Sequence, residues 1–366
     1  MLKSGTLAHD KDWFSRPGDS VLSAMSRRSV SATALAERLR GGMDQLRGII
    51  AGTSAIDASA ADALAGAVGG SIRFWIDRQE KYEAALAQAV QAVTADDGDF
   101  WLQNVPLPEP KPRGKISEQL RSAELQKRLA FYGVSTITSW RARYGSEQNA
   151  ARFRTSTSFI PSEGATSLWL RRGELEASLT STQPWSPIRL KERLAEIRAL
   201  SKISKVARFL PMLKKLLAEA GVALVIVKAP TGCRASGASR LIAADKAMIL
   251  VSFRHRSDDQ FWFTIFHEIG HLLLHDAAPF VDEDGMGEED PCEQEANEFA
   301  VDLIVPDHRV SELYRLGDDP EMIRRFAVSL GVAPGLILGQ LERRRLVDYG
   351  QFRKLRRFWT WQQIEG

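Results

Sequence analysis

The feature that most constrains this chain is the sequence His-Glu-Ile-Gly-His at 267–271, which lies in a strongly apolar segment. Aromatic residues and isoleucine dominate the stretch before it and three leucines follow, so the segment is expected to form a buried helix. On a helix, His267 and His271 stand one turn apart on the same face. That geometry lets two neutral imidazoles bind one Zn²⁺, with Glu268 as general base for the attacking water. The pentapeptide therefore predicts a zinc-dependent peptidase site; the alternative is a chance motif whose histidines only form hydrogen bonds.

A third metal ligand is expected from a second helix that begins just after Pro291. At about 100° per residue, Glu293 shares its face with Asn297 and Ala300, on a mostly small or apolar stripe. A carboxylate on a packed face requires a partner, and a metal ion is a suitable one. Glu295 falls on the opposite side of this helix, where a solvated acidic face is expected. We therefore predict Glu293 as the third ligand.

Three neighbouring residues have two interpretations each. His275 lies one further turn along the motif helix, and it either supports a ligand from behind or ends the helix at the surface. Asn297 is a second candidate for such a supporting role. Cys292 precedes the predicted ligand and is either a thiolate ligand or redox switch, or a small buried bystander.

Helix and strand signals are mixed along the chain without a regular alternation, which favours an α+β fold. Two short β-branched runs, 221–227 and 247–253, are expected to be strands of a small sheet. If the second run is a sheet edge, an extended peptide substrate can add to it. Asp258 and Asp259 are expected to cap the motif helix.

Alternating prolines between Pro106 and Pro112 predict a semi-rigid extended spacer. The spacer separates an Ala-rich, helix-patterned N-terminal part from a second helical region and the predicted sheet. The expected domains are a helical N-terminal domain at 14–95, a Pro-rich linker at 96–115, a helical middle region at 116–205, an α+β metallopeptidase domain at 206–310 and a small C-terminal helical region at 311–366.

The composition is that of an ordinary globular protein, with 44% hydrophobic and 26% charged residues. A net charge of +3 gives no argument for nucleic acid or membrane, and no run has the length of a membrane span. Two cysteines without a signal peptide favour reduced thiols and a cytoplasmic location. The basic segment 343–357 is either a second contact surface or a solvated C-terminal helix.

The motif helix, the stretch 293–300 and the sequence Leu-Ile-Val-Pro at 303–306 resemble the ImmA/IrrE family of bacterial metallopeptidases. The resemblance extends from about residue 209 to 340. It implies a zincin-like fold, His267, His271 and Glu293 as zinc ligands, and Glu268 as the catalytic residue. Members of this family typically cleave a repressor that carries a helix-turn-helix domain.

The N-terminal part, from about residue 17 to 86, resembles the HigA-like branch of the XRE helix-turn-helix domains. The resemblance implies a second helix near 33–39 and a recognition helix near 43–51. The residues expected to face DNA are then Met43, Asp44, Gln45 and Arg47. So few basic residues predict weak binding unless the protein dimerises, and a dimerisation or docking module is the alternative.

These features together predict a zinc endopeptidase with a helix-turn-helix domain, acting in a bacterial stress, prophage, toxin-antitoxin or defence circuit. The expected partner is a protein substrate, either a helix-turn-helix repressor or the chain itself. DNA and a second copy of the chain remain open as partners, and a membrane is not expected. The alternative is a DNA-binding regulator or antitoxin-like protein that senses ligand or metal without turnover, and a scaffold that only docks proteins is a third interpretation.

Overall fold

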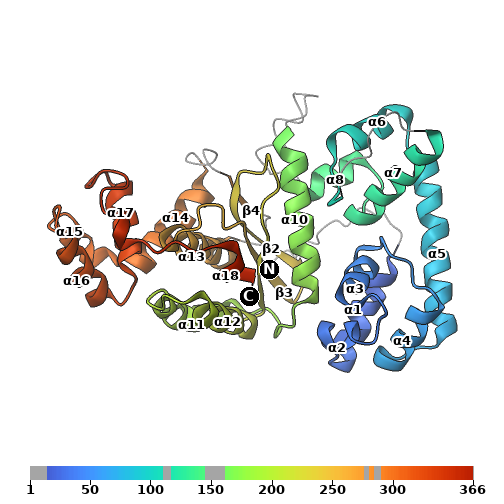
Figure 1. Ribbon diagram of the computed structural model, residues 1–366, viewed down its shortest axis with the longest axis horizontal. Coiled ribbons are helices and arrows are strands. Elements are labelled where there is room, and N and C mark those ends of the chain that lie inside the picture. Colours follow the sequence, from blue (N-terminus) through green and yellow to red (C-terminus); the bar gives the residue numbers. More distant parts are fainter. Residues whose placement is uncertain (1–14, 110–116, 145–160, 276–279, 284–289, 366) are drawn as a thin grey trace, which may run out of the picture. The chain divides into compact units, whose positions relative to one another are not determined.

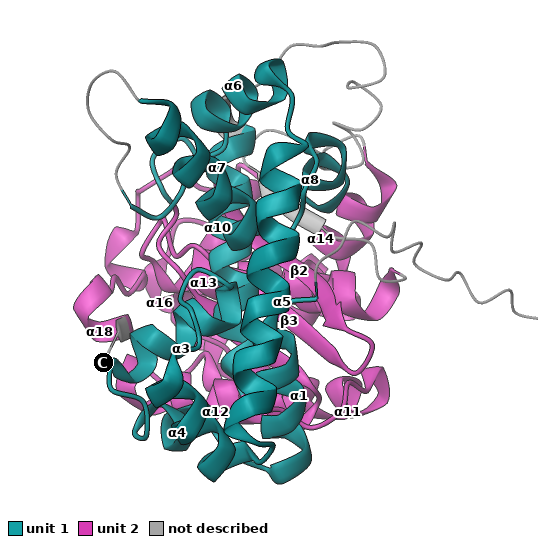
Figure 2. Ribbon diagram, turned by 90° about the vertical axis from the view of Figure 1, so that its right-hand side faces the viewer, with its two compact units in different colours: residues 1–180, 230–233 teal, residues 181–229, 234–366 magenta. Residues whose placement is uncertain are grey.

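The computed structural model describes residues 15–109, 117–144, 161–275, 280–283 and 290–365. Helices predominate, and one small sheet lies in the C-terminal half (Figure 1). The chain divides into two compact units, drawn in different colours in Figure 2. Unit 1 comprises residues 1–180 and 230–233, and unit 2 comprises residues 181–229 and 234–366. The main boundary between the two units, after residue 180, therefore falls inside 116–205, the region expected from the sequence to be one helical domain.

Unit 1 is helical over its described residues. Many of its helices begin at a serine, threonine or aspartate whose side chain accepts a hydrogen bond from the amide three residues later, as at Ser31, Asp57 and Ser71. Trp101 and Trp140 are fully buried in its core, with ring centroids 6.3 Å apart. Its helices are α1 (Pro17–Arg28), α2 (Ala32–Ala36), α3 (Gly42–Ala51), α4 (Ala58–Val68), α5 (Ile72–Gln91), α6 (Ala95–Asn104), α7 (Glu118–Tyr132), α8 (Ile137–Tyr144) and α10 (Pro161–Leu179).

Unit 2 combines the sheet with the helices that carry the predicted metal site. Its strands are β1 (Val222–Ile226), β2 (Ala235–Ala243), β3 (Lys246–Val251) and β4 (Phe280–Glu283). Its α-helices are α11 (Pro187–Leu200), α12 (Val206–Glu219), α13 (Asp258–Leu274), α14 (Pro291–Ile304), α15 (Val310–Leu313), α16 (Pro320–Leu330), α17 (Pro334–Arg343) and α18 (Trp361–Glu365), with 3₁₀ turns at Asp307–Arg309 and Arg353–Leu355.

The sheet has the strand order β1-β3-β2-β4, with β1 and β3 parallel and the other two pairs antiparallel. Strand β1 lies within the first predicted run, and β3 begins one residue before the second run and overlaps most of it, so the α+β expectation holds for this unit. The idea that 247–253 forms a sheet edge is wrong, because β3 pairs with β1 on one side and β2 on the other. The strands at the edges are β1 and β4.

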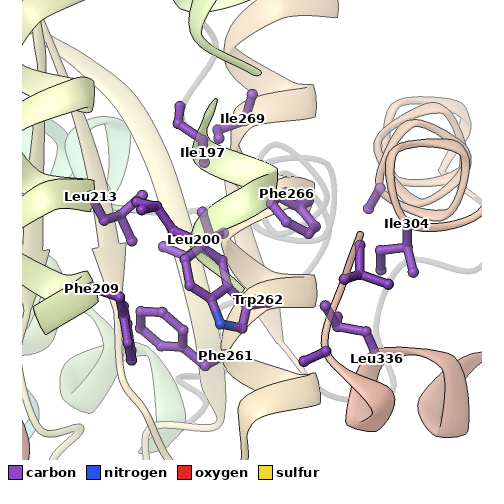
Figure 3. Packing of buried hydrophobic residues seen from close by; sticks show 14 of the residues in the cluster. Ile197, Leu200, Phe209, Leu213, Phe261, Trp262, Phe266, Ile269, Ile304 and Leu336 are labelled. Atoms are coloured by element: carbon purple, nitrogen blue, oxygen red, sulfur yellow. The ribbon is translucent and has the colours of Figure 1, made fainter. Parts of the chain in front are cut away.

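The core of unit 2 lies between one face of the sheet and helices α11, α12 and α13. Alternate residues of β3, such as Ile249 and Val251, point into it, as period-two strand geometry requires. Figure 3 shows Phe209 of α12 beside Phe261 and Trp262 of α13; their rings lie 5.7 and 5.3 Å from that of Phe209. Each fully buried side chain of this size stabilises the unit by about 1.5–3 kcal/mol. The motif helix is therefore fixed in a dry, closely packed position.

The first turn of α13 is held by buried charges rather than by caps. Ser257 precedes the helix without a side-chain capping bond, so the expectation that Asp258 and Asp259 cap it is wrong. Both aspartates lie inside the first turn and are buried because the C-terminal segment covers them. Asp258 Oδ1 accepts from the Arg357 amide at 3.0 Å, and Asp259 Oδ2 accepts from Arg356 Nε at 2.7 Å. The segment 343–357 is expected from the sequence to be either a contact surface or a solvated helix. Neither interpretation fits Arg356, because its side chain is only 6% exposed.

Among the described residues, no single helix has both the length and the apolar character needed to cross a membrane. Helices α16 and α17 satisfy that test only as a pair, and they meet at an angle of 114°.

Candidate metal centre

Three side chains from two helices converge in unit 2. His267 and His271 extend from α13, and Glu293 extends from the first turn of α14. The two Nε2 atoms lie 2.9 Å apart, and the carboxylate oxygens of Glu293 lie 3.1 Å from His267 Nε2 and 3.4 Å from His271 Nε2. Ligands of a tetrahedral zinc ion lie about 3.3 Å from one another. The three donor atoms therefore occupy positions that suit three corners of one coordination sphere.

The crossing of α13 and α14 depends on Gly270. A Cβ atom at this position would lie 3.1 Å from Phe299 Cδ1 and 3.2 Å from Ala296 Cα, closer than side chains normally pack. A glycine inside a helix lowers stability by about 1 kcal/mol relative to alanine, so its presence requires a reason. Here the reason is the close approach of α14, which brings Glu293 to the two histidines. The neighbour that requires a glycine at this position is therefore a helix.

The protonation states of these groups suit a divalent cation. Burial lowers the pKa of His271, which favours the neutral imidazole that binds metal. Burial raises the pKa of Glu293, but hydrogen bonds with His267 and His271 outweigh this effect and bring the pKa to about 2. Glu293 is therefore ionised at neutral pH. Two neutral nitrogens and one carboxylate oxygen form the donor set of a His₂Glu zinc site.

Glu268 follows the first histidine and is completely buried. Its carboxylate lies against the backbone of β2 at Gly237, on the face of the sheet that α13 covers. This residue, expected from the sequence to be catalytic, lies on the motif helix beside the two candidate ligands His267 and His271. A carboxylate at this depth, away from bulk water, is suited to a defined proton-transfer role rather than to a solvated surface.

A second layer of hydrogen bonds lies behind His271. His271 Nδ1 is 3.1 Å from His275 Nδ1, and His275 Nε2 is 3.1 Å from Glu295 Oε2. His275 ends α13 as its C-cap, as one of the two interpretations expected. Its ring also contacts His271, as the other interpretation expected. Glu295 is 61% exposed, as expected from its position on the helix. Its contact with His275 could not be expected from the positions of residues around α14 alone, because His275 belongs to α13. Asn297 is half-buried one turn beyond Glu293 and is not among the three converging side chains.

Cys292 is half-buried at the start of α14, and its amide donates to Asp290 Oδ1 at 2.9 Å. No disulfide joins it to Cys233. Its thiol is not part of the converging cluster, which consists of the two histidines and Glu293. The cluster does not support the interpretation of Cys292 as a thiolate ligand.

The residues expected to face DNA lie on α3, within the predicted recognition helix. Arg47 forms a two-bond ion pair with Glu176 of α10, at 2.7 and 3.3 Å, and a further bond with Asp44 at 3.0 Å. These contacts raise the pKa of Arg47, the largest effect being the hydrogen bond with Glu176. Gln45 Oε1 accepts from the Gly41 amide at 2.9 Å, and Met43 is half-buried. Of the four side chains expected to contact DNA, Arg47 and Gln45 thus form hydrogen bonds within unit 1, and Asp44 pairs with Arg47.

Comparison with known protein families gives one match, to the IrrE N-terminal-like domain of the peptidase M78 family, over residues 224–334. No curated protein matches the chain. The matched region runs from β1 to the start of α17 and contains both helices of the cluster. No helix-turn-helix domain is identified. Residues 224–334 are therefore similar to the IrrE N-terminal-like domain of the peptidase M78 family, and this region brings His267, His271 and Glu293 together as a candidate metal site.

Proposed function

We propose that this chain is a zinc endopeptidase. The observation that carries the proposal is the convergence of His267, His271 and Glu293 on one point, within a domain that matches a peptidase family. Metal-site geometry alone would also fit a structural zinc ion. Glu268, buried on the same helix next to a ligand, favours hydrolysis because a structural site has no need of a general base.

His267, His271 and Glu293 would hold the zinc ion, which when bound supplies a Lewis acid that polarises the scissile carbonyl and makes water acidic enough to attack it. Glu268 would accept the proton of the attacking water and return it to the leaving amine. The packed aromatic residues around α13 restrict the access of bulk water and so strengthen the electrostatic interactions of these groups.

We further propose that the substrate is a regulatory protein inside the cell, either a helix-turn-helix repressor or the chain itself. The resemblance to metallopeptidases that cleave such repressors supports this substrate class. DNA binding through α3 gains less support, because Glu176 and Asp44 neutralise Arg47 and leave α3 with little free positive charge for phosphate. The proposed activity therefore resides in unit 2 and does not depend on DNA.

Metal analysis of the purified chain tests the first step. We expect one zinc ion per chain, and we expect Glu293→Gln to lose most of it because an amide is a poor zinc ligand. Glu298→Gln is the matched control, since Glu298 is an exposed residue of the same helix.

Cleavage of a protein substrate tests the second step. Incubation with a co-encoded repressor should give defined fragments with the wild type and none after chelation. Absence of zinc from the wild type, or cleavage that persists after complete removal of the metal, would refute the proposal.

We propose that His275 orients the ring of His271 through a hydrogen bond with His271 Nδ1, the nitrogen that does not face the metal site. With His271 donating from Nδ1, His275 accepts at Nδ1 and donates from Nε2 to Glu295, so a single choice of tautomers satisfies both contacts. Loss of such a supporting contact typically weakens metal affinity by about 10–100-fold. We expect His275→Phe to show this loss in a competition assay with a zinc chelator. Glu295→Gln should show a smaller loss, because glutamine retains an acceptor oxygen. Unchanged affinity in His275→Phe would exclude the supporting role.

A further inference from the structure

Gly237 is the third residue of β2 and is paired with a strand on each side, a position where a glycine is normally unfavourable. A strand interior gains stability from a side chain, and glycine also loses more backbone freedom on folding than other residues. Gly237 is not among the glycines with positive φ, so its backbone conformation is open to any residue. Conformation does not explain this glycine, and the remaining physical reason is space.

Atoms of the motif helix already occupy that space. A Cβ atom at Gly237 would overlap with Glu268 Oε1, and it would lie 2.9 Å from Glu268 Cδ and 2.6 Å from Thr264 Cγ2. Thr264 precedes Glu268 by one helical turn, so both side chains leave α13 on the face that meets β2. The closest of the overlapping atoms belongs to the proposed general base and not to a metal ligand.

The backbone of β2 is held in place on both sides of this position. Gly237 is paired with Val251 of β3 and with Asp282 of β4, and the β4 ladder has an irregularity just before it. The Ser252 amide donates to the Ser236 carbonyl at 3.0 Å, which fixes the preceding residue as well. A strand hydrogen-bonded to neighbours on both edges cannot retreat easily from an added methyl group. The displacement would therefore fall on the side chains of α13.

We propose that Gly237 is a positioning residue for the reaction: its missing side chain forms the space that holds the Glu268 carboxylate against β2. This inference rests on the proposed function only for its catalytic consequence. The packing relation between Gly237 and Glu268 is a property of the fold, and a stability measurement tests it without any substrate.

A double-mutant cycle on thermal stability tests the packing relation. Gly237→Ala should lower Tm in the wild-type background, and part of that loss should disappear in a Glu268→Ala background, where the methyl group no longer overlaps with Glu268 and meets only Thr264. The same cycle with Thr264→Ser should recover less, because Thr264 lies farther from the added atom. Gly339→Ala is the matched control: its Cβ would lie 3.3 Å from Asp259 Oδ2, at the other end of α13, and its cost should be the same in both backgrounds. Equal costs of Gly237→Ala in all backgrounds, or recovery with Thr264→Ser alone, would overturn the proposal.

The catalytic consequence is tested on the same variants. A misplacement of about 1 Å can reduce turnover by roughly 100-fold, so Gly237→Ala should lower kcat by that order while KM changes little. The zinc content of the variant should equal that of the wild type, because the three atoms nearest to the added methyl group belong to Glu268 and Thr264 and not to a proposed ligand. Loss of zinc together with activity would overturn the assignment to Glu268. If the wild type cleaves no protein at all, the proposed function fails, and the stability cycle still decides whether Gly237 accommodates Glu268.

Discussion

Replacement of Glu268 by glutamine is expected to reduce cleavage by about 10²–10⁴-fold and to leave the zinc content unchanged. Glutamine has nearly the same shape as glutamate but cannot take a proton from water at neutral pH. The proposed metal ligands are His267, His271 and Glu293, so the substitution is expected to remove the proposed base and not the metal. The measurement is single-turnover cleavage of the protein substrate, with metal analysis of the same preparation.

Two control variants test whether the loss of cleavage is specific to the position and the reach of the Glu268 carboxylate. Glu298→Gln makes the same chemical change at an exposed position of α14 and should retain full activity. Glu268→Asp keeps a carboxylate but shortens its reach by one methylene group, and it should lose activity because the base no longer reaches the attacking water. Full activity of Glu268→Gln would remove Glu268 from the mechanism, provided that Glu293→Gln purified in the same way is inactive and so excludes contaminating proteases.

The convergence of the three proposed ligands could be predicted because the position of each depends on local geometry. Spacing along one helix places His267 and His271 on the same face, and the polar residue on a small, apolar stripe identifies Glu293. Strand β2 could not be predicted in the same way. Its first half, 235–239, consists of alanine, serine and glycine rather than β-branched residues, so it carries no strand signal of its own. It becomes a strand because β3 and β4 pair with it on both sides.

The supporting residues were missed for a related reason. The contact of Glu295 with His275 and the space at Gly237 both arise where two elements meet, and no pattern within one element encodes them. The same applies to Arg47, whose position on a helix follows from local sequence but whose partner Glu176 lies 129 residues away. Local sequence thus predicts which side chains form the candidate metal site, whereas tertiary contacts determine how they are oriented.

Substitution of Arg356 by methionine is expected to destabilise unit 2 by about 3–5 kcal/mol, which is the usual cost of removing one partner from a buried ion pair. Arg356 bonds Asp259 of α13 at 2.7 Å and Glu342 of α17 through two nitrogens. The exposed fractions of the arginine, aspartate and glutamate side chains are 6%, 4% and 7%. Both carboxylates would remain buried without this cation, so the cost comes from the stranded charges more than from the lost bonds.

Thermal unfolding measures this loss. For a unit of this size, the expected decrease in Tm is about 6–20 °C. Lys354→Met is the matched control, because Lys354 is an exposed residue of the same segment and its replacement should leave Tm nearly unchanged. The decrease should also be accompanied by weaker zinc retention on heating, since Asp259 belongs to the first turn of the helix that carries both histidines.

The triple variant Arg356→Met, Asp259→Asn, Glu342→Gln separates stranded charge from lost packing. If the cost arises from unpaired carboxylates, neutralising both should restore much of the lost Tm, because buried amides require no cation. If the triple variant is as unstable as the single one, the arginine acts mainly through packing, for example on the ring of Tyr349, 5.6 Å from its guanidinium carbon. Recovery would mean that the C-terminal segment, which lies beyond the matched residues 224–334, supplies the charge that lets the motif helix begin in a buried position. The matched residues would then be only part of a larger folding unit, and a fragment ending at residue 334 would not fold on its own.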